Sequence, residues 1–168
     1  MSSNDDRTQP VEVIVLNKRT VTVSRLVEIA FKPFAAQFAE KDIKINMNLP
    51  YTLPDIECDV AKIAWVLSIF FSNAVRYTPE WGKLSVVGAT KNKMLRICVE
   101  NTGYGIPTES VERMFEHPEN EDTNSFGQGL ALLLAREIID AHKGKLGVES
   151  ELGVMTQFYF ELPLNTKL

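Results

Sequence analysis

The chain has 168 residues, of which 45% are hydrophobic and 24% are charged, and its formal net charge is -4. This length and composition fit one globular domain with one core, and they exclude collagen-like and intrinsically disordered chains. The negative charge argues against a broad nucleic-acid-binding surface, which requires clustered Lys and Arg. Two distant cysteines, Cys58 and Cys98, lack the spacing of a zinc site and are expected to be reduced, partly buried thiols.

The N-terminus has no sign of a targeting or membrane segment. Residues 1–10 are polar and acidic and are expected to form a flexible lead, followed by one domain over residues 11–168. No apolar run is long enough to span a bilayer, so we expect no direct membrane contact by this domain. We therefore expect a cytoplasmic domain, which could be the cytoplasmic part of a membrane-anchored parent.

The first part of the sequence predicts a strand, a bent helix and a second strand. The first strand is expected over residues 11–16, followed by an amphipathic helix that Ser24 caps. Pro33 lies within that helix and should bend it, because proline removes a backbone donor and crowds the preceding turn. Alternating apolar and polar residues over 43–49 predict a half-buried strand.

A second long helix and a hairpin follow. Asp59 is expected to cap a helix that extends to about Tyr77 and buries one apolar face. Two strands, at 83–90 and 94–101, should pair as a hairpin across residues 91–93.

The next elements are a short helical turn, a loop and a third helix. The turn is expected at 111–115, and the polar, aperiodic residues 117–126 predict a mobile loop. The helix at 130–142 is strongly apolar and should end at Gly144.

The chain closes with two strands, expected at 145–150 and 156–162. The resulting order is strand, helix, strand, helix, two strands, loop, helix, two strands. This order predicts an α/β (α+β) domain, a two-layer sandwich in which helices pack together on one face of a mixed sheet.

Three short segments hold polar and glycine residues that such a scaffold does not itself need. In the first, Asn73 lies in the middle of a helix, where asparagine is a poor helix former, and Arg76 lies on the same side one turn later. A solvent-facing or backbone-bonded asparagine is the simpler alternative for Asn73.

The other two segments are glycine pairs. Gly103 and Gly105 directly follow a strand, where glycine permits positive φ and close approach of the backbone to a ligand. Gly127 and Gly129 lead into an apolar helix, whose unpaired N–H groups and dipole favour phosphate. Taken singly, the first pair is equally well a turn and the second a helix start.

Together and in this order, the three segments resemble the N box and the two glycine boxes of the GHKL superfamily of ATPases, which has a Bergerat-type fold. The resemblance is to the histidine kinase branch in particular, and it rests on the stretches SNAVRYTPEWGKL, GLALLLAREIIDAHKGKLGVES and GVMTQFYFELP. It covers nearly all of the chain after the first ten or so residues.

The resemblance implies a site for ATP or ADP with Mg²⁺. Asn73 matches the asparagine that helps hold Mg²⁺ against the phosphates, a role that suits an amide oxygen. Arg76 matches a basic position near the phosphates, and Tyr77 a position beside the nucleotide. Asn101 stands where the family usually has an aspartate that accepts a hydrogen bond from the adenine amino group. The other nucleotide-binding positions that the resemblance implies are Gly103, Gly105, Ile106, Phe115, Gly127, Gly129 and Leu130, with residues 117–126 as an ATP lid.

Four positions depart from the family pattern. Ile69, Ala131 and Met155 stand where many members have an asparagine and two glycines, and Asn101 replaces a carboxylate. A charge-assisted hydrogen bond contributes about 1.5–3 kcal/mol against about 1 kcal/mol for a neutral one, so the affinity for adenine should be about tenfold lower. Restoring the carboxylate with Asn101→Asp should then tighten binding.

Neither of the two histidines lies in the acidic helical context of a phosphoacceptor. His142 is expected to cap a helix C-terminus with a favourable dipole contact, and His117 to be a solvated loop residue. The phosphoacceptor histidine must therefore lie on a hairpin of the parent protein outside this chain, or on another chain.

The resemblance implies the ATP-binding catalytic domain of a two-component sensor histidine kinase. Such a domain presents the γ-phosphoryl group of Mg-ATP to the phosphoacceptor histidine, with a response regulator downstream, and none of its side chains need act as a nucleophile. One alternative is a degenerate GHKL domain with weak or no nucleotide binding that signals through protein contacts, which Ile69, Asn101 and Ala131 favour. The other is a serine kinase of the anti-sigma type.

Overall fold

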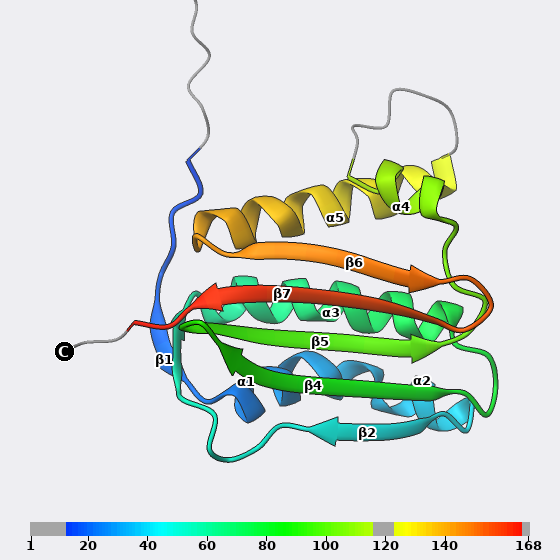
Figure 1. Cartoon of the computed structure of the whole chain (residues 1–168), viewed down its shortest axis with the longest axis horizontal. Coiled ribbons are helices and arrows are strands. Elements are labelled where there is room, and N and C mark those ends of the chain that lie inside the picture. The colour runs from blue at the N-terminus through cyan, green and yellow to red at the C-terminus, as the bar shows by residue number, and fades with distance from the viewer. Residues whose placement is uncertain (1–12, 116–122, 166–168) are drawn as a thin grey trace, which may run out of the picture.

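The computed structural model describes residues 13–115 and 123–165, and for 123–128 the backbone alone. A single hydrophobic core joins its helices to its larger sheet. The elements in chain order (Figure 1) are β1 (Arg19–Val21), α1 (Val23–Phe31), the 3₁₀ turn η1 (Lys32–Phe34), α2 (Ala35–Glu40), β2 (Lys44–Asn48), β3 (Ile56–Cys58), α3 (Val60–Tyr77), β4 (Lys83–Lys91), β5 (Met94–Thr102), α4 (Thr108–Arg113), α5 (Thr123–Ala141), β6 (Lys145–Glu151) and β7 (Met155–Pro163).

The larger sheet has five strands in the order β2-β4-β5-β7-β6. The β2–β4 pair is parallel, and the other three pairs are antiparallel. The helices pack on one face of this sheet, and no described helix covers the other face (Figure 1). The predicted two-layer sandwich with a mixed sheet is therefore confirmed. None of the helices in the described ranges combines the length and apolar content that a bilayer span requires.

The first predicted strand is wrong in position. Residues 13–16 have no regular structure, and 11–12 lie outside the described residues. The strand is β1, which pairs antiparallel with β3 in a separate small sheet. The sequence did not predict β3, because a strand of three residues is too short to establish an alternating pattern.

The cap of the first helix also differs from the prediction. Thr22, rather than Ser24, is the N-cap, and its side chain accepts a hydrogen bond from the Arg25 backbone N–H at 3.1 Å. Ser24 already lies inside the first turn, where its hydroxyl cannot take that role. The predicted bend at Pro33 is confirmed, because the 3₁₀ turn η1 separates α1 from α2 there.

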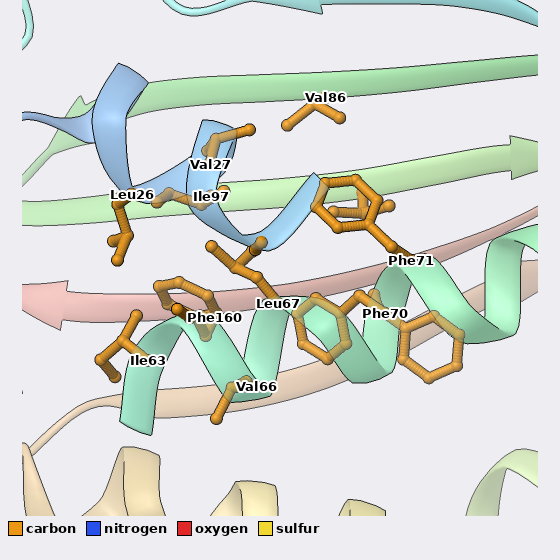
Figure 2. Close-up of a cluster of buried hydrophobic side chains, with 14 of the residues drawn as sticks. Leu26, Val27, Ile63, Val66, Leu67, Phe70, Phe71, Val86, Ile97 and Phe160 are labelled. Carbon is orange, nitrogen blue, oxygen red and sulfur yellow. The ribbon is translucent and has the colours of Figure 1, made fainter. Parts of the chain in front are cut away.

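The core lies between the helices and the sheet, and among the described elements α3 contributes more of its largest buried side chains than any other. Figure 2 shows Ile63, Leu67 and Phe70 of α3 beside Phe160 of β7, and all four side chains are fully buried. The Phe70 ring also stacks on Phe158 of β7, with the ring centroids 5.3 Å apart. Burying each side chain of this size stabilises the fold by about 1.5–3 kcal/mol, so α3 is firmly fixed against the sheet.

Asp59 caps α3 as predicted, with its side chain accepting a hydrogen bond from the Lys62 backbone N–H at 3.2 Å. At the end of α5, the left-handed residue is Lys143 (φ 61°) rather than Gly144. Gly144 donates its N–H to the Ile139 carbonyl at 3.0 Å, and a Cβ at this glycine would overlap the Glu161 carbonyl oxygen. Glycine is needed there for close packing and not for its backbone angle.

Both helices that flank the predicted loop begin earlier in the sequence than expected. α4 begins at Thr108, before the predicted turn at 111–115, and α5 begins at Thr123 instead of residue 130. Residues 123–126 of the predicted loop are therefore helical, and 117–122 lie outside the described residues. The prediction failed because the first turns of α5 hold Thr, Asn, Ser and Gly, which give no apolar periodicity.

The two cysteines are free and buried. Burial raises the pKa of the Cys58 thiol to about 11, and the neighbouring Asp59 charge adds to the increase. Burial likewise raises the pKa of Cys98 to about 11, against a lowering hydrogen bond from Gln157. Both groups are therefore neutral thiols at physiological pH, which makes them poor nucleophiles and metal ligands.

Candidate nucleotide-binding site

A small cavity of about 40 Å³ lies where the last turns of α3 meet the end of β5 and the start of β7. Five of its lining residues are positions that the sequence predicted for the nucleotide. The complete lining is Asn73, Tyr77, Asn101, Tyr104, Gly105, Ile106, Thr156 and Phe158.

Asn73 faces this cavity from α3. The residue is 7% exposed, and its side chain has no hydrogen-bond partner among the described residues. It is not bonded to the backbone, which was one of the simpler alternatives. Among the described residues only Thr78 Oγ1 is a buried side-chain polar atom without a partner, so the amide atoms of Asn73 are accessible from the cavity, where water or a ligand can bond to them.

Asn101 lies at the end of β5 and is 4% exposed. Its Nδ2 atom donates a hydrogen bond to the Thr102 carbonyl oxygen at 3.2 Å. The opposite orientation of the amide would place Oδ1 against that carbonyl oxygen, so the donor must be on this side. The Oδ1 atom is left as an acceptor without a partner among the described residues.

Sequence reasoning missed Tyr104, Thr156 and Phe158. Thr156 is the cross-strand neighbour of Asn101 and is 5% exposed. A signal for it existed, because Thr156 is the polar member of the core-facing row that continues with Phe158, Phe160 and Leu162. Tyr104 had no such signal, since it lies in a loop and is largely exposed.

The loop that follows β5 is tied to the β6–β7 turn by the backbone. Gly103 donates its N–H to the Val154 carbonyl at 3.2 Å, and Gly153 donates to the Tyr104 carbonyl at 2.6 Å. The Ile106 N–H donates to the Ser150 hydroxyl at 2.6 Å. These bonds fix the loop that carries three of the cavity-lining residues, Tyr104, Gly105 and Ile106.

The glycines of this loop are required by the protein's own packing. A Cβ at Gly105, whose φ is 71°, would lie 2.5 Å from the Glu151 carbonyl oxygen. A Cβ at Gly103 would lie 2.8 Å from the Tyr77 carbonyl oxygen. Gly105 lines the cavity and Gly103 does not, so close approach to α3 and to the β6–β7 turn explains these glycines without a ligand.

Several predicted positions lie away from the cavity. Arg76 is exposed, with its Cζ atom 5.9 Å from the ring centroid of Tyr77. Phe115 is half-buried beside Arg136, whose Cζ atom lies 5.4 Å from the ring centroid. Leu130 is 43% exposed on α5. None of these residues lines the cavity.

The second glycine pair was predicted to precede its helix, but the structure places it inside the helix. Gly127 and Gly129 lie inside α5, beyond the first four residues, so their N–H groups are within the range of intrahelical bonding. A Cβ at Gly129 would meet nothing within 4 Å, so open space adjoins it. The prediction failed because the glycines mark the second turn of α5 and not its start.

His142 caps the end of α5, as predicted, but it does so as a neutral ring and not through a charge on the helix dipole. The residue is 4% exposed; its Nδ1 donates to the Ile138 carbonyl at 2.8 Å, and its Nε2 accepts from the Asp59 N–H at 3.0 Å. Burial lowers the pKa of His142, against a raising contribution from the Ile138 carbonyl. The ring is therefore neutral and connects α5 to the start of α3. His117 lies outside the described residues.

The fold and the cavity identify the class of protein. The chain belongs to the family described as histidine kinase-, DNA gyrase B- and HSP90-like ATPases, whose model matches residues 58–166. Within that family it is an ATP-binding catalytic domain of the histidine kinase type, as its similarity to sequences and structures of such kinases shows.

Two curated relatives are adaptive-response sensory kinases SasA. The protein from Gloeothece citriformis is 36% identical over 137 residues, which are 79% of this chain and 35% of the relative. The protein from Synechocystis is 30% identical over 149 residues, which are 87% of this chain and 39% of the relative. The chain thus spans little more than a third of the length of these relatives.

Solved structures of histidine kinases share the fold. The nucleotide-free catalytic domain of ThkA has a TM-score of 0.76 and 26% identity, covering 89% of this chain and 96% of that domain. Full-length ShkA in complex with AMPPNP has a TM-score of 0.79 and 28% identity, covering 90% of this chain and 32% of ShkA. ThkA in complex with the response regulator TrrA has a TM-score of 0.74 and 26% identity, covering 89% of this chain and 42% of that one.

Proposed function

We propose that this chain binds Mg-ATP in the cavity between α3 and β5 and presents the γ-phosphoryl group to a phosphoacceptor histidine outside the chain. The observation that carries the proposal is the pair of buried amides, Asn73 and Asn101, which are 7% and 4% exposed and line the same cavity. Each has polar atoms without a partner among the described residues. These atoms are accessible from the cavity, where water, or a ligand that displaces it, completes their hydrogen bonds.

The two amides suit opposite ends of the nucleotide. The Oδ1 atom of Asn101 accepts a hydrogen bond from the adenine amino group, and Ile106 and Phe158 supply apolar surface for the base. The amide oxygen of Asn73 is a hard ligand of the type that Mg²⁺ binds together with phosphate oxygens and water. Bound Mg²⁺ would neutralise charge on the phosphates. The exposed Arg76, one turn beyond Asn73, adds positive charge on the phosphate side.

The cavity must widen to admit a purine. A water molecule needs about 10–15 Å³ of cavity volume. The cavity has about 40 Å³ in all, so it has room for a few water molecules but not for a purine. Tyr104 is the lining residue best placed to yield, because 81% of it is exposed and little packing is lost when it turns outward. We therefore expect nucleotide binding to displace the Tyr104 ring.

The contribution of this domain to phosphoryl transfer is positioning and charge neutralisation, since this reaction asks little covalent chemistry of the protein. The acceptor histidine belongs to a hairpin of a longer parent or of another chain. A response regulator then receives the phosphoryl group, and the complex of ThkA with the response regulator TrrA supports a partner of this class. We place the domain in the cytoplasm, where ATP is available.

Calorimetric titration of ATP and ADP, with and without Mg²⁺, tests the proposal. The native chain should bind both nucleotides, and Asn101→Ala should lose at least about tenfold in affinity because a buried acceptor disappears. Asn46→Ala, on the exposed edge strand β2, is the matched control and should bind like the native chain. If the native chain binds neither nucleotide, the proposal fails and a protein-interaction module remains.

A further inference from the structure

Lys41 joins the N-terminal helices to the end of α3. It is the first residue after α2, and its half-buried side chain reaches the C-terminus of a helix more than thirty positions further along the chain. The Nζ atom donates to the Val75 carbonyl at 2.7 Å and to the Thr78 carbonyl at 2.8 Å. The Lys41 carbonyl oxygen accepts from the Trp81 N–H at 3.0 Å.

These bonds complete the end of α3. The last carbonyl groups of a helix have no partners within it, and the negative end of the helix dipole favours a cation. Thr78 is 0% exposed, so water cannot replace the ammonium group at its carbonyl. Removal of the Lys41 side chain would leave a buried carbonyl unpaired, and the chain after Tyr77 would have to shift to hydrate it.

The same turn of α3 forms part of the nucleotide cavity. Asn73 and Tyr77 line the cavity from this turn. The Tyr77 carbonyl also lies against Gly103, where an added Cβ would be only 2.8 Å from it. A shift of the Tyr77–Thr78 backbone would therefore reach the cavity by two routes, through the α3 side chains and through the loop after β5.

We propose that Lys41 is a positioning residue for nucleotide binding. It touches no ligand and acts by fixing the last turn of α3, and the inference rests on the function proposed for the cavity. Lys41 thereby links the α2–β2 connection to the cavity, because its backbone belongs to that connection and its side chain binds the end of α3.

The test compares Lys41→Met, Lys41→Arg and the control Lys44→Met in the full chain. Lys44 lies three positions away on β2 and is exposed, and its side chain makes no hydrogen bond or ion pair with any described residue. Its replacement removes the same charge. At a temperature where all variants are folded, Lys41→Met should bind ATP roughly fivefold or more weakly, since a charged donor to buried carbonyls is lost. Lys41→Arg should recover most of the affinity, because guanidinium can also donate to two carbonyls, and Lys44→Met should match the native chain.

A second readout needs no nucleotide. In NMR spectra of the free proteins, Lys41→Met should shift the backbone amide signals of Tyr77 and Gly103 and the side-chain amide signal of Asn73, whereas Lys44→Met should not. Unchanged signals together with unchanged ATP affinity, at a lowered melting temperature, would reduce Lys41 to a helix cap and overturn the inference. If the native chain binds no ATP, the proposed function fails, and the spectra still decide whether Lys41 positions the cavity residues.

Discussion

The Nε2 atom of His142 accepts a hydrogen bond from the backbone N–H of Asp59 at 3.0 Å, across 83 positions of sequence. The bond joins the end of α5 to the N-cap of α3, and it exists only while His142 is neutral, because a protonated ring has no acceptor. The helix that carries Asn73 is therefore held at its start by a titratable group.

This bond predicts that stability falls in mild acid. Burial lowers the pKa of His142 below 6.5, so the unfolded chain binds a proton that the folded chain excludes. The free energy of unfolding should be at its plateau above about pH 7.5 and should decrease as the pH falls through about 6.5 and below. Urea unfolding at a series of pH values measures this. His142→Gln should be less stable at neutral pH but nearly flat over the same range, whereas the control His117→Gln should keep the native pH dependence.

A separate loss should follow at lower pH. Burial by itself would raise the pKa of Asp59, but hydrogen bonds from the Asn17 and Lys62 backbone N–H groups and the Lys62 charge outweigh it and lower the pKa below 3.8. The contribution of the Asp59 carboxylate to the free energy of unfolding is fully present above about pH 5, and it is lost as the pH falls through the lowered pKa. Asp59→Asn should remove this second decrease and leave the first, which the same urea series would reveal.

Asn101→Asp should bind adenine nucleotides no more tightly than the native chain. The sequence predicted the opposite, because it considered the charge alone. In the structure, the variant loses the hydrogen bond to the Thr102 carbonyl and places a carboxylate oxygen about 3.2 Å from that carbonyl oxygen. Because this repulsion favours a protonated carboxyl group at residue 101, the variant offers the nucleotide no charged acceptor, and the expected gain in affinity is not realised. Calorimetry with ADP decides the matter, and a tenfold tighter complex would show that residue 101 turns away from Thr102.

The side-chain amide of Asn101, whose orientation the Thr102 carbonyl fixes, should also discriminate between purine nucleotides. Because Nδ2 is engaged with Thr102, residue 101 offers the ligand only an acceptor, which matches the 6-amino group of adenine. The 6-oxo group of inosine triphosphate would place two acceptors together, so ITP should bind at least about tenfold more weakly than ATP. Competition titrations measure the ratio. Equal binding of ATP and ITP would mean that Asn101 does not contact the base.

Gly105 and Gly153 form a matched pair for a stability test. Both have positive φ, 71° and 78°, so alanine at either pays the left-handed penalty of about 1–2 kcal/mol. A Cβ at Gly105 also meets the Glu151 carbonyl oxygen at 2.5 Å, whereas one at Gly153 meets nothing within 4 Å. Gly105→Ala should therefore cost about 1–3 kcal/mol more than Gly153→Ala in urea unfolding. Similar losses would indicate that the β6–β7 turn yields easily.

The sequence predicted the layer architecture because long helices and alternating strands carry strong periodic signals. It failed at β3, which is too short for a period, and at the start of α5, where polar residues conceal the helix. For the site, helix spacing and family motifs were enough to select Asn73 and Asn101. They could not reveal that the Asn101 side chain donates to the neighbouring Thr102 carbonyl, because that depends on the orientation of the side chain in the folded loop. They also could not reveal that Lys41 reaches α3, because that depends on how distant segments meet.

The parallel pairing of β2 with β4 has a consequence for the order of folding. Lys44 pairs with Lys83 across the whole of β3 and α3, while β4 and β5 are joined by the tight turn at Asn92 and Lys93, both with positive φ. Closing the longer loop costs more chain entropy, so the hairpin should form early and β2 should dock late. Lys41, just before β2, would then reach α3 only in that last step. Pulse-labelled hydrogen exchange should show amide protection in β5 before β2, and the ability to bind nucleotide should be the last property that the folding chain acquires.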